Sequence, residues 1–205
     1  MTQKPDWMIS HGQPWAVAAE RPVYDNPWIT VTEYDAIAPT GAPALYGVVR
    51  FKNMALVVLP LHDDGTVTLV GQNRFAIPGY SWELPAGGGP HGIDALESAQ
   101  RELREEAGLK AADWREVLQF QLSNSITDEI GRGYLAIGLT PAPTAPDATE
   151  VLALVRAPFR EALDAAVAGH IQDMPTLALL LRAYHMAREG ALPGALAKAM
   201  LSWPG

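Results

Sequence analysis

The 205-residue sequence contains no cysteine, and this absence removes two ways of stabilising a fold. Neither a disulfide nor a thiolate metal site can form, so a bound metal ion would be held by oxygen atoms or by histidine. The five histidines are scattered along the chain and do not resemble a zinc site. A chain without cysteine is compatible with a reducing compartment.

Positive charge and long apolar runs are also scarce. The chain has 15 Lys and Arg against 23 Asp and Glu, which gives a net charge of -8. Non-specific binding of nucleic acid needs clustered Lys and Arg, so the composition argues against it. The N-terminus lacks a basic start followed by an apolar core, and no apolar run has the length of a membrane span. We therefore expect a cytoplasmic protein that binds neither nucleic acid nor membrane.

Alternating and β-branched residues predict strands, and helical periodicity predicts helices near the C-terminus. The expected strands are residues 27–37, 44–51, 55–62, 66–75, 114–121 and 133–139, and the expected late helices are 158–170 and 174–190. Asp64 and Gly65 predict a hairpin between two of these strands. The stretch 140–150 is rich in Pro, Thr and Ala and is expected to be a loop. Strands, a central helix and terminal helices together indicate an α+β sandwich.

The central helix is the element with the clearest signals. It follows the glycines at 87–89, where a loop is expected, and Asp94 can cap its first turn while Gly108 can end it. Glu102 and Glu106 stand four residues apart, and Glu105 lies beside them on the same face. Three carboxylates on one face repel one another, which a hard cation such as Mg²⁺ or Mn²⁺ would relieve. The plain alternative is a solvated face of salt bridges.

The stretch from Gly87 to Leu109 resembles the Nudix box, which reads G-x5-E-x7-R-E-U-x-E-E-x-G-U with U apolar. All but one of its fixed positions match, and the exception is Ile93 in place of the first glutamate. In the family that glutamate is thought to pair with the box arginine, here Arg101. The substitution therefore puts the positioning of Arg101 in doubt more than the cation site. Alternatively, Ile93 packs into an apolar pocket that this chain has built around it.

The segment "QNRFAIPGYSWELPAG" at 72–87 resembles that of ADP-ribose pyrophosphatases and related nucleoside diphosphate sugar hydrolases. The resemblance implies that Arg74 contacts the substrate's phosphate and that Glu83 accepts hydrogen bonds from the substrate. It also implies that the backbone carbonyl of Ala86 is a metal ligand. The alternatives are a surface arginine, an edge-strand glutamate and a simple turn.

The stretch 122–139 resembles the mobile loop of the family, in which a glutamate is the catalytic base or a further metal ligand. Glu129 is the candidate here and Asp128 is the next one. A loop suits this role because it can close over a substrate, although the stretch also fits a polar turn.

Residues 1–50 are longer than small triphosphate-cleaving members of the superfamily need. In ADP-ribose pyrophosphatases such a segment is a strand module that exchanges across a homodimer and supplies aromatic side chains to the substrate. The resemblance implies this role for Trp28 and Tyr46, although both would also suit a strand core. We expect a homodimer in which residues 1–50 form this module and residues 51–205 form the Nudix hydrolase domain.

Taken together, the resemblances imply an α/β/α sandwich with a mixed sheet and an N-terminal β module. They imply Mg²⁺- or Mn²⁺-dependent hydrolysis of a nucleoside diphosphate derivative, first ADP-ribose to AMP and ribose 5-phosphate. The implied catalytic residues are Glu129, Glu105 and Arg101, and the implied metal ligands are Ala86, Glu102, Glu105 and Glu106. The alternatives are another NDP-sugar, a dinucleotide, or a ligand sensor that binds without turnover.

Overall fold

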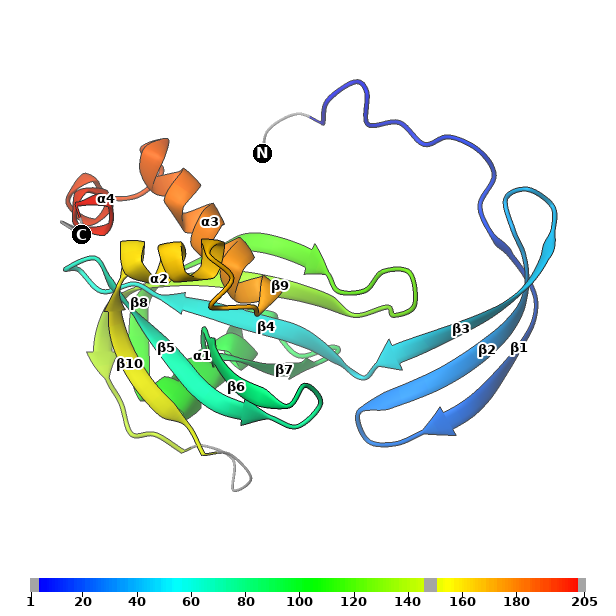
Figure 1. Ribbon diagram of the computed structural model, residues 1–205, viewed down its shortest axis with the longest axis horizontal. Coiled ribbons are helices and arrows are strands. Elements are labelled where there is room, and N and C mark those ends of the chain that lie inside the picture. The colour runs from blue at the N-terminus through cyan, green and yellow to red at the C-terminus, as the bar shows by residue number, and fades with distance from the viewer. Residues whose placement is uncertain (1–3, 146–150, 203–205) are drawn as a thin grey trace. The chain divides into compact units, whose positions relative to one another are not determined.

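The computed structural model describes residues 4–145 and 151–202, and it divides into two compact units. The first unit contains the chain up to Lys52 together with the segment Ser123–Asp128. The second contains Asn53–Leu122 and the chain from Glu129 onwards. Figure 1 shows the strands of the first unit in blue and cyan.

The first unit is a three-stranded antiparallel sheet. Its strands are β1 (Ala16–Asp25), β2 (Ile29–Ile37) and β3 (Pro43–Phe51), in the order β1-β2-β3. Segment 123–128 joins this sheet through the backbone, because the N–H of Val49 donates to the carbonyl of Ile126 at 2.9 Å. β1 was not predicted, and every one of its residues is exposed, so it has no alternation of apolar and polar residues to reveal it.

The central sheet of the second unit is mixed. It consists of β7 (Ala86–Pro90), β4 (Asn53–Pro60), β9 (Ile130–Pro141) and β8 (Leu109–Gln121), in that order. β4 and β9 are parallel, whereas the two outer pairings are antiparallel. Both faces of the sheet are buried, and β4 shows this by alternation. Leu56 and Val58 face one core, and Val57 and Leu59 face another.

Helices cover both faces of this sheet. Helix α1 (Ala95–Ala107) packs on the core that contains Leu56. The other core holds α2 (Phe159–Val167), α3 (Met174–Arg188) and α4 (Gly194–Leu201). It also contains residues of a second sheet, formed by β10 (Ala153–Pro158), β5 (Thr66–Arg74) and β6 (Gly79–Glu83). The predicted α/β/α sandwich with a mixed sheet is confirmed (Figure 1). None of the helices in the described ranges has the length and apolar character needed to cross a bilayer.

Two expectations about local structure were wrong. The turn at Asp64-Gly65 exists, but it does not join two strands of one sheet. A bridge between Leu61 and Val67 and a 2.9 Å hydrogen bond from the N–H of His62 to the carbonyl of Thr66 close it, but β4 and β5 belong to different sheets. The glycines at 87–89 form strand β7 rather than a loop, because they pair with β4. β6, β10 and α4 were not predicted, and β8 begins at Leu109 rather than at 114.

Candidate active site

Helix α1 is positioned by the caps that its sequence predicts. The side chain of Asp94 accepts a 2.9 Å hydrogen bond from the N–H of Leu96, which satisfies one of the free donors of the first turn. At the other end Gly108 adopts the left-handed conformation, with φ of 62°, and its N–H donates to the carbonyl of Arg104. Leu103 is fully buried beneath the helix. These contacts fix which side chains of α1 face strand β7.

Of the three clustered glutamates Glu102, Glu105 and Glu106, two are buried rather than solvated. Glu102 is 9% exposed and Glu106 is 6% exposed. The backbone N–H of Ala86 donates to Oε2 of Glu106 at 2.9 Å. A Cβ added to Gly87 would lie 2.2 Å from the carboxyl carbon of Glu102, so only glycine permits this approach. The solvated-face alternative is therefore wrong for Glu102 and Glu106, which lie against the start of β7.

Arg101 is the counter-ion of the acidic face. Its guanidinium pairs with Glu102 at 2.6 Å and with Glu105 at 2.7 Å, and it donates to the carbonyl of Gly88 at 3.1 Å. Burial alone would lower the pKa of Arg101, but the charges and hydrogen bonds of Glu102 and Glu105 outweigh it and raise the pKa. The arginine is thus held between α1 and β7 by side chains of the helix itself.

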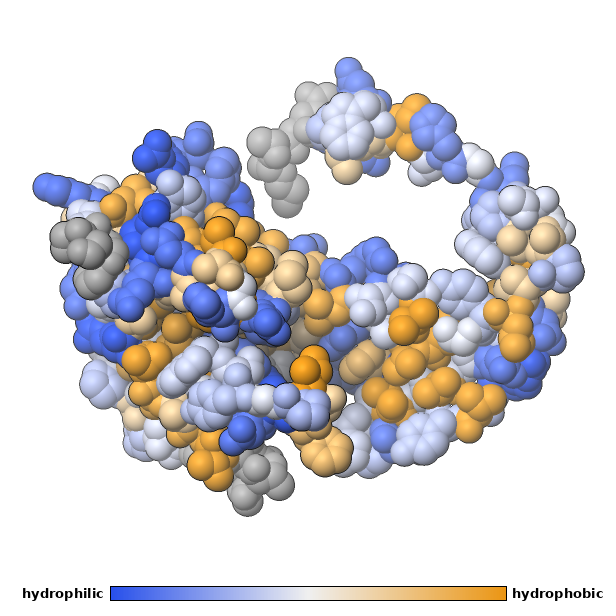
Figure 2. All heavy atoms as spheres, viewed as in Figure 1, coloured by the Kyte–Doolittle hydropathy of each residue, from blue (hydrophilic) through white to orange (hydrophobic). Residues whose placement is uncertain are grey.

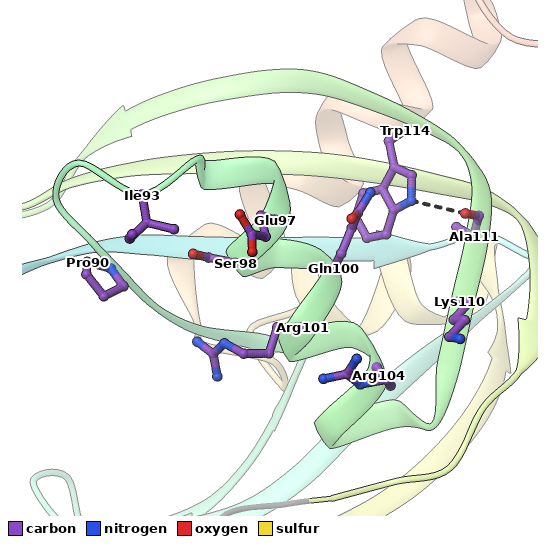
Figure 3. Close-up of a pocket in the computed structure, with 10 residues that line it drawn as sticks. All are labelled: Pro90, Ile93, Glu97, Ser98, Gln100, Arg101, Arg104, Lys110, Ala111 and Trp114. Carbon is purple, nitrogen blue, oxygen red and sulfur yellow. Dashed lines mark hydrogen bonds between the residues drawn. The ribbon is translucent and has the colours of Figure 1, made fainter.

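Ile93, which stands where the family has its first glutamate, does not belong to the core. Its side chain is 53% exposed, so the expectation of an apolar pocket built around it was wrong. The side chain lines an open groove along α1 instead (Figure 3). Because Arg101 takes its partners from α1 and β7, its observed position does not depend on a carboxylate at 93.

Arg74 and Glu83 face each other across the β5–β6 hairpin. Nε of Arg74 donates to Oε1 of Glu83 at 2.9 Å, and its terminal nitrogen pairs with Oε2. Glu83 is 5% exposed. Burial alone would raise its pKa, but hydrogen bonds from Arg74 and Ser81 and the charge of Arg74 bring the pKa below its ordinary value. Their expected roles as substrate contacts remain predictions.

The segment that carries Glu83 and Ala86 is held from below by α3, a feature that the sequence did not reveal. The N–H of Leu84 donates to the hydroxyl of Thr176 at 2.9 Å. Thr176 is fully buried and lies in the first turn of α3, where its own N–H donates to the cap residue Asp173. A contact between residues 92 positions apart leaves no local pattern in the sequence.

The remaining candidates come from the N-terminal unit and from the residue that precedes β9. Trp28, which is 67% exposed, and Tyr46, whose hydroxyl donates to the carbonyl of Ser125, belong to the N-terminal unit. Asp128 also belongs to that unit, where it pairs with Arg50 at 3.1 Å and accepts from the N–H of Phe51. Glu129 is half-buried immediately before β9, and its carbonyl accepts from the N–H of Leu122.

The donors that the second unit gathers at β7 fit a hard cation. They are oxygen atoms only, and two of them belong to carboxylates that the fold buries beside Ala86 and Gly87. Within residues 4–145 and 151–202, no three His, Asp or Glu side chains are arranged to hold one metal ion together. Arg101 occupies the carboxylates of Glu102 and Glu105, so a cation would have to replace it there.

Comparison with known proteins agrees with this geometry. The family model described as the NUDIX domain matches residues 52–177 of this chain. The chain is 30% identical over 146 residues to an ADP-ribose pyrophosphatase of Mycobacterium tuberculosis, an alignment that covers 68% of this chain and 69% of that protein. It is 28% identical over 182 residues to the CMP-5'-(N-acetyl-N-hydroxy-3-aminopropyl)phosphonate hydrolase of Streptomyces rubellomurinus, with 88% and 87% covered.

A solved structure described as an ADP compounds hydrolase superposes with a TM-score of 0.79. It covers 90% of this chain and 100% of its own, and at 20% identity it supports the fold alone. The family model spans more than half of the chain and includes β7, α1 and the segment around Glu83. The chain therefore belongs to the Nudix family and is a Nudix pyrophosphohydrolase.

Proposed function

We propose that the protein hydrolyses the pyrophosphate bond of a nucleoside diphosphate derivative, with ADP-ribose as the first candidate. Water would add to one phosphorus atom while the bond from that atom to the bridging oxygen breaks, which releases AMP and ribose 5-phosphate. The observation that carries the proposal is the burial of Glu102 and Glu106 against Ala86 and Gly87. Burying two like charges beside a glycine strand costs free energy. A cation that binds these carboxylates together with a diphosphate would offset that cost.

Nudix hydrolases generally use divalent metal ions, and we propose Mg²⁺ or Mn²⁺ for this one. Glu102, Glu105, Glu106 and the carbonyl of Ala86 would be the ligands, since all offer the oxygen atoms that these ions prefer. A divalent ion bound there would neutralise the diphosphate and lower the pKa of water. Arg101 would then exchange its carboxylate partners for the negative charge of the substrate or remain as a positioning residue beside Gly88.

Glu129 is our proposed base, and Arg74 and Glu83 are our proposed substrate contacts. Glu129 is half-buried at the entry to β9, whereas Asp128 is already engaged by Arg50 and by the N–H of Phe51. Glu129 also belongs to the second unit, which contains α1 and β7, whereas Asp128 belongs to the N-terminal unit, and this difference favours Glu129. A base acts mainly in the transition state, so Glu129→Gln should lower kcat far more than it raises KM. A change confined to KM would make Glu129 a substrate-binding residue instead.

The N-terminal sheet is our proposed dimerisation module, with Trp28 and Tyr46 as contacts to the nucleobase. Exposed apolar side chains support this role, since Trp28, Val17 and Leu45 are each more than half exposed. Figure 2 shows apolar side chains in orange among those of the N-terminal strands. Exposed apolar residues on a sheet with open edges are typical of a surface that pairs with another chain. Light scattering should give a homodimer, and a mass of 22.1 kDa would contradict it.

A second candidate substrate has its own support. The Streptomyces rubellomurinus relative, named a hydrolase of a CMP-linked phosphonate, aligns over a larger share of the chain than the Mycobacterium tuberculosis ADP-ribose pyrophosphatase. A CMP-linked phosphonate therefore stands beside NDP-sugars and dinucleotides as an alternative to ADP-ribose. A ligand sensor without turnover is disfavoured, because Glu102, Glu105 and Glu106 are all retained.

A substrate panel tests these proposals directly. The full chain is assayed with ADP-ribose, GDP- and UDP-hexoses, a dinucleotide, a CMP-linked phosphonate and a nucleoside triphosphate, first with Mg²⁺ and then with Mn²⁺. Chromatography of the products should show AMP and ribose 5-phosphate from ADP-ribose. Faster turnover of the CMP compound would transfer the assignment to it, and no turnover of any compound would favour the sensor.

A further inference from the structure

A second concave site lies on the side of α1 that carries Arg104, next to Ile93 in the turn before the helix. Its volume is about 630 Å³, within the range of small-molecule pockets. The wall contains residues of β7, of the turn before α1, of α1 itself and of β8, and Figure 3 shows their side chains around the hollow. Glu102, Glu105 and Glu106 are not among the lining residues, so this groove lies beside the proposed cation site and shares Arg101 with it.

The charge of the groove is opposite to that of the chain. Its lining contains Arg101, Arg104 and Lys110 against Glu97, whereas the whole protein carries a net charge of -8. Arg101 is engaged by Glu102 and Glu105. Arg104 has only a long 3.6 Å contact with Glu105, and Lys110 forms no ion pair with any residue that the structure describes. Two cations at the boundary of α1 and β8 are therefore available to an anion.

The rest of the wall contains the polar side chains of Ser98 and Gln100 and an apolar part that includes the aromatic ring of Trp114. Trp114 is half-buried in β8, and its indole N–H already donates to the carbonyl of Ala111 at 3.2 Å. The ring packs against Tyr134, at 6.3 Å between centroids in an edge-to-face arrangement. With its one polar atom satisfied inside the protein, Trp114 has only its ring surface left to offer a ligand. Ile93 and Pro90 extend this apolar wall.

We propose that this groove binds a nucleoside monophosphate, with the phosphate on Arg104 and Lys110 and the base against Trp114. A phosphate suits paired Arg and Lys donors, and a planar base suits an indole face. Inorganic phosphate would use the cations but not the ring, so it should bind more weakly. The proposal does not depend on the substrate of the enzyme, because it rests on the groove and its charges alone.

The test is an NMR titration of the full-length protein in EDTA, which follows the indole N–H of Trp114 after assignment with Trp114→Phe. AMP should shift this resonance in a saturable way. Inorganic phosphate should bind at least about fivefold more weakly than AMP. The double variant Arg104→Gln with Lys110→Gln should bind AMP about tenfold or more weakly than the wild type, since each cation contributes a charged hydrogen bond. Arg104→Lys keeps the positive charge and should lose less AMP affinity than the double variant.

The matched control is Arg188→Gln with Lys198→Gln, which removes the same charge from exposed positions on α3 and α4. It should bind AMP within about twofold of the wild type, since only screened long-range charge is lost. A double groove variant that binds as tightly as this control would overturn the proposal. The absence of a saturable shift at about 10 mM AMP would do so as well, as would equal affinity for phosphate and AMP. No turnover is measured, so these outcomes leave the hydrolysis assay independent.

Discussion

The backbone N–H of Ala86 donates to the carboxylate of Glu106 across 2.9 Å, and this bond joins strand β7 to helix α1. Glu106 is therefore not part of a solvated face of salt bridges, which was the plain alternative for these carboxylates. The side chain is only 6% exposed and satisfies a backbone donor of the strand that carries the proposed carbonyl ligand. Glu106 therefore has a structural role as well as its proposed role in holding a cation.

The two roles of Glu106 can be separated by choosing the replacement. Glu106→Gln keeps an oxygen that accepts from Ala86, so its melting temperature should stay close to that of the wild type. Glu106→Ala leaves that partly buried N–H without its carboxylate partner and should cost about 1 to 3 kcal/mol of unfolding free energy. Denaturant unfolding of the two variants side by side provides the measurement. Equal stability of the two would remove the structural role.

Glu83 should make the protein sensitive to acid. Its pKa in the folded state lies below the ordinary 4.5, so its contribution is present above that value and is lost as the pH falls through the folded pKa. Glu83→Gln should lower the melting temperature at pH 7. The loss of unfolding free energy should be only about 1 kcal/mol, because Arg74 is partly solvated. At pH 3 the difference should shrink. Glu161→Gln, at an exposed position of α2, serves as control. A stability difference between the wild type and Glu83→Gln that grows as the pH falls would contradict this account.

Thr176 should position the segment Glu83–Ala86 from beneath. Thr176→Val removes the acceptor of the Leu84 N–H at a fully buried position, which should lower the free energy of unfolding by about 1 to 3 kcal/mol. The variant should also lower kcat by a larger factor than it changes KM. Thr176→Ser keeps the hydroxyl and loses a methyl group, worth about 0.8 kcal/mol. The serine variant should retain the kcat of the wild type. If serine and valine impair kcat equally, the hydrogen bond has no positioning role.

Ile93→Glu should be tolerated, because the side chain is 53% exposed and no apolar core is disturbed. A carboxylate beside the cap Asp94 meets the positive end of α1, a contribution of about 0.3 to 1 kcal/mol when exposed. Activity should be equal to the wild type or a few-fold higher, as expected for a modest gain around Arg101. Thermal melts and initial rates check both statements. A clear loss of stability would show that the isoleucine contributes packing that its exposure does not suggest.

Local signals predicted α1 well, and they failed where long-range contacts determine the structure. Asp94 and Gly108 mark both ends of the helix, so its bounds follow from capping chemistry. Strand β7 has the sequence AGGGP, which has little intrinsic tendency to form a strand. It forms because β4 pairs with it and because Glu102 needs the space that a Cβ at Gly87 would fill. Neither cause can be read from the segment itself.

The candidate site shows the same division. The spacing of Glu102, Glu105 and Glu106 predicts a shared face of α1, but it does not predict that two of the three are buried. Periodicity gives the face of a helix and leaves open what covers it, here the backbone of β7. Arg74 and Glu83 were each expected to contact substrate, and their mutual ion pair emerges only when β5 and β6 form a hairpin.

The central claim is that carboxylates of α1 hold the cation that hydrolysis requires, and the rate of ADP-ribose hydrolysis against Mg²⁺ concentration tests it most directly. The wild type should need Mg²⁺ or Mn²⁺. Glu106→Gln, which preserves the bond from Ala86, should be slowed by about a hundredfold or more at saturating Mg²⁺, the loss expected for a disabled metal site. Glu161→Gln should behave like the wild type. Near wild-type turnover by Glu106→Gln in its folded form would contradict the assignment of the metal site.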